Sequence, residues 1–355
     1  MSQIYEIFGR DAHAMTIRLM TEAAVASRIP KGASIALKPN LVVAAKPETG
    51  ATTHPGVLSG AIEYLQAHGF DRICVMEGSW IGDRTDRTRR VAGYDRICAA
   101  YRVPFYDLKQ DSTITVQSAV GPMDICRLAL EADYLIDLPV LKGHCQTLMT
   151  CALKNLKGCL PDREKRHFHT LGLHKPIGAL AAALRPRLVI VDSICGDLDF
   201  EEGGNPVHTN RMLLGFDPVR IDAYGCSLMG IPVDDVPYIR YAEQWGAGSA
   251  AFSPEDIVTL NRPQEAADYP APTGVVANLT RSVHQDRACS ACFASLVRAL
   301  HLSGGCSSPV YIGQGFRGKA VDGLGIGVCC SCASSCVRGC PPSAQDILKA
   351  LQERP

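Results

Sequence analysis

The stretch YLIDLPVLK, residues 134–142, indicates the fold class more directly than any other part of the chain. It is an apolar run broken by a single aspartate, which is typical of a strand buried on both faces of a parallel sheet. The same form, an apolar run that ends in polar residues, recurs in ASIALKPN (33–40), RICVMEGS (72–79) and RLVIVDS (187–193). We therefore expect a buried strand at each of these places.

Helical stretches alternate with these strands. HPGVLSGAIEYLQAHG, residues 54–69, has a proline where the first turn of a helix tolerates one, places Leu58, Ile62 and Leu65 on one face, and ends at a glycine. A second helix is expected over IGALAAAL, residues 177–184. The alternation predicts an α/β domain with a mainly parallel sheet and flanking helices.

Composition excludes several classes of protein. The chain has 355 residues, of which 46% are hydrophobic, so it can bury a sizeable core. Lysine plus arginine equals aspartate plus glutamate, 36 each, so no overall charge attracts nucleic acid or an anionic membrane. We find no signal-peptide pattern at the start and no apolar run of about 18 residues. These features predict a cytoplasmic protein without nucleic-acid or membrane partners, in which thiols stay reduced.

The sixteen cysteines are unevenly distributed. Eight are scattered among apolar neighbours in the first 288 residues, where small buried thiols are the expected interpretation. The other eight fall between Cys289 and Cys340. This contrast predicts an α/β domain over residues 1–265 and a small cysteine-rich domain over 275–355, joined by the Pro/Ala-rich stretch 261–274.

Polar residues at the ends of the predicted strands indicate a site. Ligands of open α/β sheets bind outside the carboxyl ends of the strands. Those ends carry Lys38 and Asn40, Glu77, Asp137 with Lys142, and Asp192. The alternative is that these residues only mark where each strand leaves the core.

A basic segment, residues 141–175, follows the third strand and has many more lysines, arginines and histidines than acidic residues. Such a local excess favours a carboxylate or phosphate ligand, with a solvated basic face as the alternative. His167, His169 and His174 could bind a metal, although the spacing H-x-H alone is a weak signal. GQGFRGK, residues 313–319, matches the glycine pattern of a dinucleotide site, but no helix follows it, so we set that function aside.

Several motifs together resemble a known family. LKPNLV, TTHPGV, DLPVLKGH, ALKNLKGCLPD, LVIVDSICG and EEGGNPV occur in an order similar to that of the domain-of-unknown-function 362 family, over about Ile35 to Gly230. The C-terminal region resembles the iron–sulfur tail of some members, with CSAC first, IGVC at 326–329 and GCPP last. The resemblance implies an α/β fold and an iron–sulfur cofactor, and it implies no particular reaction.

The cysteine spacing and the resemblance together predict a [4Fe–4S] cluster. Cys289 and Cys292 form a C-x-x-C pair, Cys340 precedes a proline as a terminal ligand often does, and Cys329 is the fourth expected ligand. Cys306, Cys330, Cys332 and Cys336 are surplus. Two clusters, a zinc site, or disulfides and free thiols remain as alternatives.

The function that we predict is a [4Fe–4S]-dependent oxidoreductase acting on a small anionic substrate. The alternatives are a non-redox lyase or isomerase with a structural or Lewis-acid cluster, and an electron-transfer protein. The expected partners are a ferredoxin- or flavodoxin-like redox protein and, as one option, a second copy of the chain. The predicted catalytic residues are Lys38, Glu77, Lys142, Lys157 and Asp192, and the predicted substrate-binding residues are Asn40, His144, Lys154 and Asn155.

Overall fold

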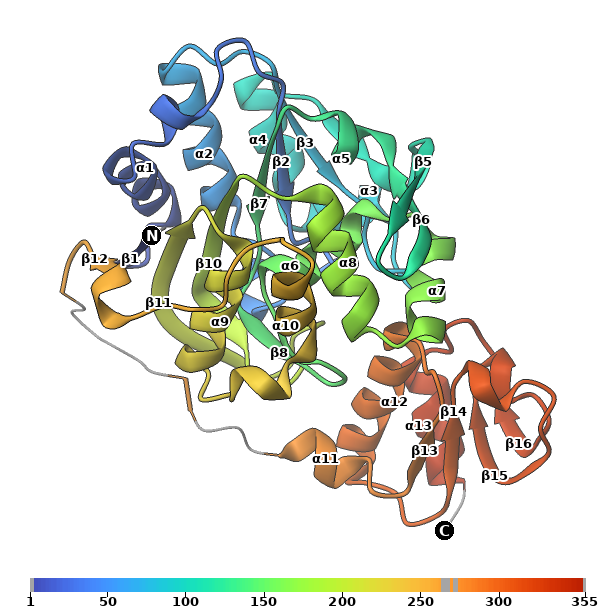
Figure 1. The fold of residues 1–355 in the computed structure, drawn as a ribbon. Coiled ribbons are helices and arrows are strands. Elements are labelled where there is room, and N and C mark those ends of the chain that lie inside the picture. The colour runs from blue at the N-terminus through green and yellow to red at the C-terminus, as the bar shows by residue number, and fades with distance from the viewer. Residues whose placement is uncertain (1–2, 263–268, 271–273, 354–355) are drawn as a thin grey trace. The chain divides into compact units, whose positions relative to one another are not determined.

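The computed structural model describes residues 3–262, 269–270 and 274–353 (Figure 1). The chain divides into two compact units, one of residues 1–164 and 174–272 and the other of residues 165–173 and 273–355. The sequence predicted domains over 1–265 and 275–355, and the structure differs by grouping the segment Lys165–Leu173 with the C-terminal unit. Most of the predicted linker, residues 263–268 and 271–273, lies outside the described residues.

The first unit is built on a large, mainly parallel sheet of eight described strands. In spatial order they are β12 (Ile257–Thr259), β1 (Ile4–Phe8), β11 (Pro206–Gly215), β10 (Leu188–Asp197), β7 (Tyr134–Leu138), β2 (Ile35–Pro39), β3 (Ile73–Glu77) and β4 (Phe105–Asp107). β11 is antiparallel to both its neighbours, and the other pairs are parallel. The prediction of an α/β fold with a mainly parallel sheet and flanking helices is confirmed.

The four predicted strands correspond to β2, β3, β7 and β10. Their register places Lys38 of β2 beside Asp137 of β7, and Asp137 beside Val189 of β10. The polar residues Lys38 and Asp137, from separate segments of the chain, are therefore neighbours in the sheet. The predicted strand 134–142 is shorter than expected, because β7 ends at Leu138. Pro139 follows it, a residue that lacks the N–H needed to continue a ladder.

Helices cover both faces of the sheet (Figure 1). α1 (Ala12–Glu22), α2 (Pro55–Ala67) and α4 (Tyr94–Tyr101) pack with one face of the strands in a single apolar core. On the other face α6 (Ala152–Asn155), α8 (His174–Leu184), α9 (Pro218–Leu228) and α10 (Pro237–Gln244) pack against one another. The other α-helices before residue 174 are α3 (Thr85–Val91), α5 (Arg127–Glu131) and α7 (Asp162–Leu171). The predicted helix 54–69 is α2, which begins after His54 and is followed by Gly69 with a φ of 81°.

Two hairpins lie outside the large sheet. They are β5 (Thr113–Ser118) with β6 (Gly121–Cys126), and β8 (Lys142–His144) with β9 (Leu148–Thr150). β8 takes the start of the basic segment away from the sheet, which places Lys142 and His144 in a strand of their own.

The C-terminal unit has a parallel sheet of four described strands in the order β13 (Val283–Gln285), β14 (Val310–Ile312), β15 (Val321–Ile326) and β16 (Ala333–Val337). Its helices are α11 (Val275–Leu279), α12 (Ser290–Ser303) and α13 (Ala344–Gln352). α12 buries Phe293, Leu296, Val297 and Leu300, so this unit has an apolar core of its own.

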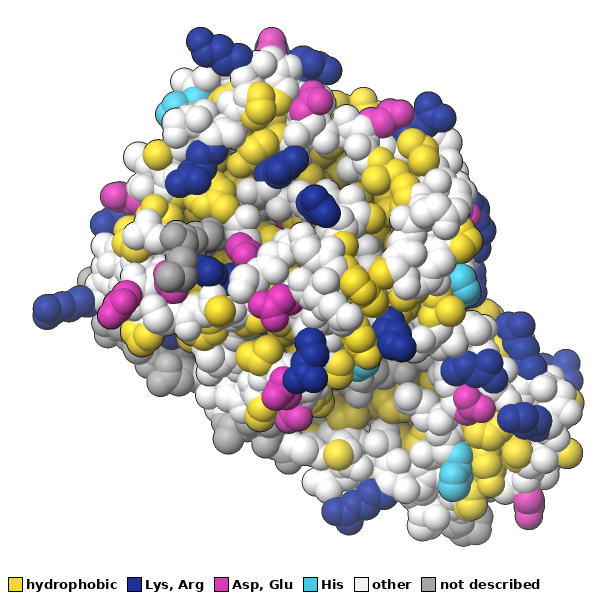
Figure 2. All heavy atoms as spheres, in the orientation of Figure 1, with side chains coloured by type: hydrophobic (Ala, Val, Ile, Leu, Met, Phe, Trp, Pro, Cys, Tyr) yellow, Lys and Arg dark blue, Asp and Glu magenta, His cyan; other side chains and the backbone are white. Residues whose placement is uncertain are grey.

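On the visible face of the molecule, basic and acidic side chains are interspersed (Figure 2), as the equal numbers of the two kinds in the sequence lead one to expect. No helix among the described residues has the length and apolar character needed to cross a membrane.

Candidate functional site

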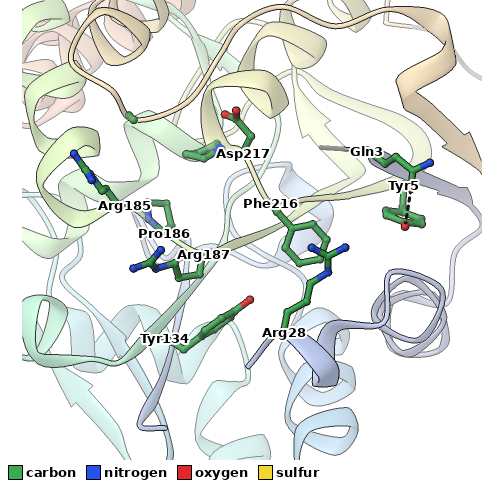
Figure 3. A pocket seen from close by; sticks show the side chains of 11 residues that line it. Gln3, Tyr5, Arg28, Tyr134, Arg185, Pro186, Arg187, Phe216 and Asp217 are labelled. Carbon is green, nitrogen blue, oxygen red and sulfur yellow. Dashed lines mark hydrogen bonds between the residues drawn. The ribbon is translucent and has the colours of Figure 1, made fainter. Parts of the chain in front are cut away.

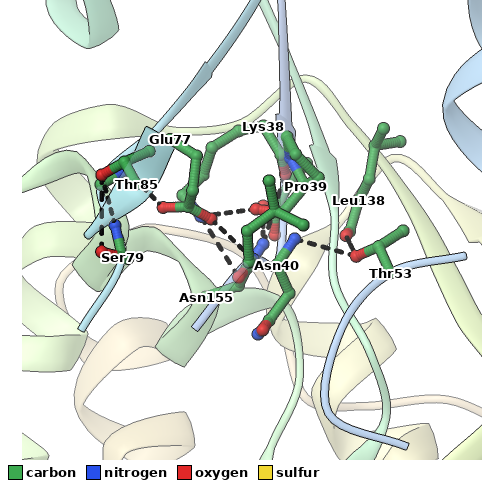
Figure 4. A network of polar contacts seen from close by, with 12 residues as sticks. Lys38, Pro39, Asn40, Thr53, Glu77, Ser79, Thr85, Leu138 and Asn155 are labelled. Carbon is green, nitrogen blue, oxygen red and sulfur yellow. Dashed lines mark hydrogen bonds and ion pairs between the residues drawn. The ribbon is translucent and has the colours of Figure 1, made fainter. Parts of the chain in front are cut away.

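A buried polar network joins the ends of β2 and β3 (Figure 4). Lys38 Nζ lies 2.8 Å from Glu77 Oε2, and it also donates to Asn155 Oδ1 at 3.2 Å and to the Pro39 carbonyl at 2.9 Å. Asn155 Nδ2 donates to Asp137 Oδ1 at 2.7 Å. Lys38 has no exposed side-chain area and Glu77 only 3%. The network therefore joins predicted catalytic and substrate-binding residues, but its members contact one another rather than solvent.

The surroundings of this network set its charge state. Burial alone would lower the pKa of Lys38, but Glu77, Cys159 and Asp137 outweigh it and raise the pKa above its ordinary value. Burial raises the pKa of Asp137 well above its ordinary value, and Asp137 Oδ2 has no hydrogen-bond partner among the described residues. Gly158 closes the network, since a Cβ there would lie 1.9 Å from Glu77 Oε1. The neighbouring acidic groups thus favour the charged form of Lys38, and burial favours the neutral form of Asp137.

A second network surrounds Lys142 and Lys154. Lys142 Nζ donates to the carbonyls of Ala51 and Glu201 at 2.5 and 2.8 Å and to Asn40 Oδ1 at 3.3 Å. Lys154 Nζ forms an ion pair of 2.6 Å with Glu201 Oε1. Both lysines are buried, so neither belongs to a solvated basic face.

Two groups of the second network titrate near neutral pH. Burial lowers the pKa of Lys142 to about 8, and burial with the neighbouring Glu201 raises the pKa of Glu202 to about 8. Burial would raise the pKa of Glu201 as well, but Lys154 and His144 hold it well below the ordinary value. Groups with a pKa close to neutrality are suited to proton transfer.

His144 is neutral in this network. Burial and Lys154 lower its pKa to about 4, and the charge of the half-buried Lys157 acts in the same direction. The backbone N–H groups of Gln146 and Thr147 both donate to His144 Nδ1 at 3.0 Å, so the ring hydrogen lies on Nε2. That atom is 3.0 Å from Glu201 Oε2 but lacks the alignment of a hydrogen bond.

Asp192 lies apart from these networks and lines an open cavity of about 420 Å³. Its Oδ2 accepts the backbone N–H of His54 at 2.7 Å, and its Oδ1 accepts that of Ile194 at 3.0 Å. Burial raises the pKa of Asp192. Arg10 and His208 also line the cavity. The helices α1 and α2 begin within two residues of Arg10 and His54, so their N-terminal N–H groups add a field that favours anions.

His54 has a defined orientation at this cavity. Its Nδ1 accepts the backbone N–H of Gly56 at 3.0 Å, so the neutral ring carries its hydrogen on Nε2. Sequence reasoning quoted His54 only within the motif TTHPGV and as the first residue of the predicted helix 54–69, and it missed Arg10 and His208. The signal for Arg10 was its position between the end of β1 at Phe8 and the start of α1 at Ala12, the same rule that selected the other candidates.

The structure thus separates the predicted site residues into three places. Lys38, Glu77 and Asn155 meet in the first network, Asn40, Lys142, His144 and Lys154 in the second, and Asp192 lines the cavity. Their catalytic and binding roles stay predictions.

In the C-terminal unit, four cysteines line one small cavity, of about 30 Å³. They are Cys289 and Cys292 at the start of α12, Cys329 after β15, and Cys340 after β16. These are the four predicted cluster ligands, and no carboxylate lines the cavity with them. Burial, together with the nearby thiols of Cys289, Cys340 and Cys329, raises the pKa of Cys292 to about 12.

Hydrogen-bond donors point at two of these sulfur atoms. Arg317 Nε lies 3.4 Å from Cys329 Sγ, and Gln314 Nε2 lies 3.6 Å from Cys289 Sγ. Both donors come from GQGFRGK, the stretch that sequence reasoning set aside as an imperfect dinucleotide motif. Arg166 also lines the cavity, and His169 Nε2 accepts the backbone N–H of Ser290 at the start of α12.

The surplus cysteines point elsewhere. Cys330 is buried with its Sγ near the Gly313 carbonyl, Cys336 Sγ lies 3.5 Å from the Gly327 carbonyl, and Cys332 is exposed. All sixteen cysteines are free thiols in the structure. Of the eight scattered ones, six are buried, as expected of small apolar residues, and Cys74 and Cys145 are partly exposed.

Among the described residues, no three His, Cys, Asp or Glu side chains are arranged to hold a single metal ion. The three histidines His167, His169 and His174 therefore form no such group. His167 and His169 belong to the C-terminal unit, and His174 belongs to the first unit. The ligands of a cubane do not converge on one point, because each thiolate binds a different iron.

Comparisons with known proteins found a family, a relative and a solved structure. The chain is 25% identical over 253 residues to the thylakoid-associated protein sll1697 of Synechocystis sp., covering 67% of this chain and 75% of that protein. It also resembles the lactate racemase apoprotein of Thermoanaerobacterium thermosaccharolyticum, with a TM-score of 0.41 and 14% identity over 64% of this chain. The chain spans 57% of the length of the racemase. Residues 35–227 match the model of the domain of unknown function DUF362, and the chain belongs to that family.

Proposed function

We propose that this chain is an iron–sulfur protein whose C-terminal unit binds one [4Fe–4S] cluster through Cys289, Cys292, Cys329 and Cys340. The observation that carries the proposal is that these cysteines, which span 52 residues of sequence, line one cavity. A cluster bound there would supply one-electron chemistry.

The donor set suits such a cluster. All four donors are thiols, which iron–sulfur clusters select, and carboxylates, which would favour harder metals, are absent from the lining. Four thiolates repel one another without a cation, which is the reason that neighbouring thiols raise the pKa of Cys292. Arg317 and Gln314 would donate to ligand sulfurs, and such hydrogen bonds raise the reduction potential of a cluster.

Anaerobic purification tests the cluster. The protein should contain about four irons and four inorganic sulfides per chain. Serine at any of the four ligands should remove most of the visible absorption. The matched control is Cys332→Ser, because Cys332 is an exposed thiol in the same region. Stoichiometric zinc without sulfide, in protein never exposed to air, would refute the proposal.

Reduction separates the redox function from a non-redox lyase or isomerase. With excess dithionite, a redox cluster takes up about one electron per chain and gives a paramagnetic signal. A cluster that stays oxidised under these conditions would favour the lyase.

We further propose that a small carboxylate or phosphate binds in the cavity at Asp192. The sequence placed the anion among Lys38, Lys142, Lys154 and Lys157. The buried contacts of the first three leave them no solvent-facing charge, and Lys157 is half-buried. The cavity instead has Arg10, two residues before α1, and His54, directly before α2, whose ring is oriented through Gly56; the carboxylates of Glu48 and Asp192 line it as well. In this arrangement Arg10 binds the anionic group, and His54 Nε2–H donates to it or transfers a proton.

Calorimetry with inorganic phosphate, oxalate, malonate and succinate tests the cavity. Arg10→Gln should weaken the best of these ligands by about tenfold or more. Arg90→Gln, an exposed arginine on α3, should leave binding unchanged. Equal binding by both variants would place the ligand elsewhere.

A further inference from the structure

A second cavity, of about 570 Å³, lies at the opposite end of the large sheet from the Asp192 cavity (Figure 3). Tyr134 is the first residue of β7, Arg187 directly precedes β10, and Phe216 directly follows the antiparallel β11. The lining residues therefore belong to the amino-terminal end of the parallel strands. The proposed function makes no use of this cavity.

The cavity carries an excess of positive charge. Arg28, Arg185 and Arg187 line it, and each is exposed. No ion pair of these three arginines is found among the described residues. In a chain with equal numbers of acidic and basic residues, three such arginines around one hollow are a local exception.

Asp217 is the carboxylate among the lining residues, and it accepts hydrogen bonds from backbone N–H groups. Asp217 Oδ1 accepts the N–H groups of Val219 and Arg220 at 2.9 and 3.1 Å, and Asp217 Oδ2 accepts that of Ser249 at 2.8 Å. Asp217 thus caps α9, and no ion pair between it and the three arginines is found among the described residues.

The guanidinium groups of Arg28 and Arg187 lie on either side of Tyr134 (Figure 3), while Arg185 Nε donates to the Ala182 carbonyl at 2.9 Å. Figure 3 shows the Tyr134 hydroxyl directed between Arg28 and Arg187. Burial raises the pKa of Tyr134 to about 12, and the charges of Arg28 and Arg187 both act to lower it. Arg28 stacks on the Phe216 ring at 4.1 Å, which fixes its guanidinium group at the edge of the cavity.

We propose that this cavity binds an organic phosphate carrying more than one negative charge, of the kind of a nucleoside diphosphate. Planar guanidinium groups bind phosphate oxygens in pairs, and the Tyr134 hydroxyl adds a donor. Phe216, Pro186 and Pro218 supply apolar surface for the organic part. The volume lies within the range of about 300–1,000 Å³ that small-molecule sites occupy.

Isothermal titration calorimetry of the full chain tests this site with three probes: adenosine diphosphate, inorganic pyrophosphate and citrate. Adenosine diphosphate should bind most tightly, pyrophosphate more weakly because it lacks the organic part, and citrate most weakly. Arg187→Gln should weaken adenosine diphosphate by about tenfold or more, and Arg187→Lys, which keeps the charge, by less. Arg90→Gln should have no effect.

Three results would overturn the proposal: no binding of either phosphate at millimolar concentration, equal binding by wild type and Arg187→Gln, or tighter binding of citrate than of both phosphates. Urea unfolding of each variant ensures that lost binding does not reflect lost folding. Binding that survives in Arg10→Gln assigns the ligand to this cavity and not to the one at Asp192.

Discussion

Charged residues follow several strands of the same sheet, and their surroundings differ at Lys38 and at Asp192. Lys38 is enclosed by Glu77 and Asn155 and has no exposed side-chain area. Asp192 is equally buried, but the groups beside it, Arg10 and His54, open onto a cavity of about 420 Å³. Polar residues at strand ends can therefore serve either the fold or a ligand, and their neighbours decide which.

A mutation should have different effects on stability in the closed network and in the open cavity. In a closed network, removal of one partner leaves an uncompensated buried charge. In an open cavity, water replaces a lost side chain, so the fold changes little while a ligand is affected. The variants below test this division, from the largest expected effect to the smallest.

Lys38→Met should reduce the free energy of unfolding by about 3–5 kcal/mol, because it leaves the Glu77 carboxylate buried without its partner. Urea unfolding measures the change. The double variant Lys38→Met/Glu77→Gln should recover part of the loss, since it removes both charges. A Lys38→Met protein as stable as wild type would mean that the network is open to water.

Asp222 is a buried residue of α9 that accepts the backbone N–H groups of Ala152 and Leu153 at 2.7 and 3.3 Å. Asp222→Asn should change how stability depends on pH. Burial raises the pKa of Asp222 in the folded protein to about 7, against about 4 in the unfolded chain. The folded state thus binds the proton more tightly, and stability falls as pH rises through this window. From pH 5 to pH 7 the wild type should lose about 2 kcal/mol more than Asp222→Asn. Urea unfolding at the two pH values measures the loss, and an equal loss in both proteins would contradict this.

Gly158→Ala should cost about 1–3 kcal/mol, because the new methyl group would lie 1.9 Å from Glu77 Oε1 and must displace the buried ion pair. Thermal unfolding measures the loss. Gly172→Ala is a useful comparison, since a Cβ there meets nothing within 4 Å and only its φ of 78° opposes the change. A Gly158→Ala protein as stable as wild type would mean that the contact with Glu77 does not matter.

Arg10→Gln should change the free energy of unfolding by no more than about 0.5 kcal/mol, since Arg10 is exposed at the cavity. The same variant should weaken binding of a small anion. Urea unfolding and calorimetry on one preparation separate the two effects. A large loss of stability would place Arg10 with the closed networks.

Much of the fold follows from local patterns. The apolar runs of β2, β3, β7 and β10, the proline start of α2 and the concentration of cysteines after residue 288 are each readable within a short window of sequence. The motif order over Ile35 to Gly230 likewise indicated the family that the match over residues 35–227 confirms. These features depend on side-chain periodicity and backbone geometry, which neighbouring residues determine.

The partners of the polar residues did not follow from the sequence. Lys38 meets Glu77 across 39 positions and Asn155 across 117, and Glu201 lies 47 positions from Lys154. Arg10 and His208 lie far apart in the chain, and so do Arg28 and Arg187 of the second cavity. The sequence by itself determined which segments form strands and helices and which cysteines to expect together. Only the tertiary structure decided which charges are paired inside the protein and which line a cavity, because burial and electrostatics depend on distances in space between residues far apart in the chain.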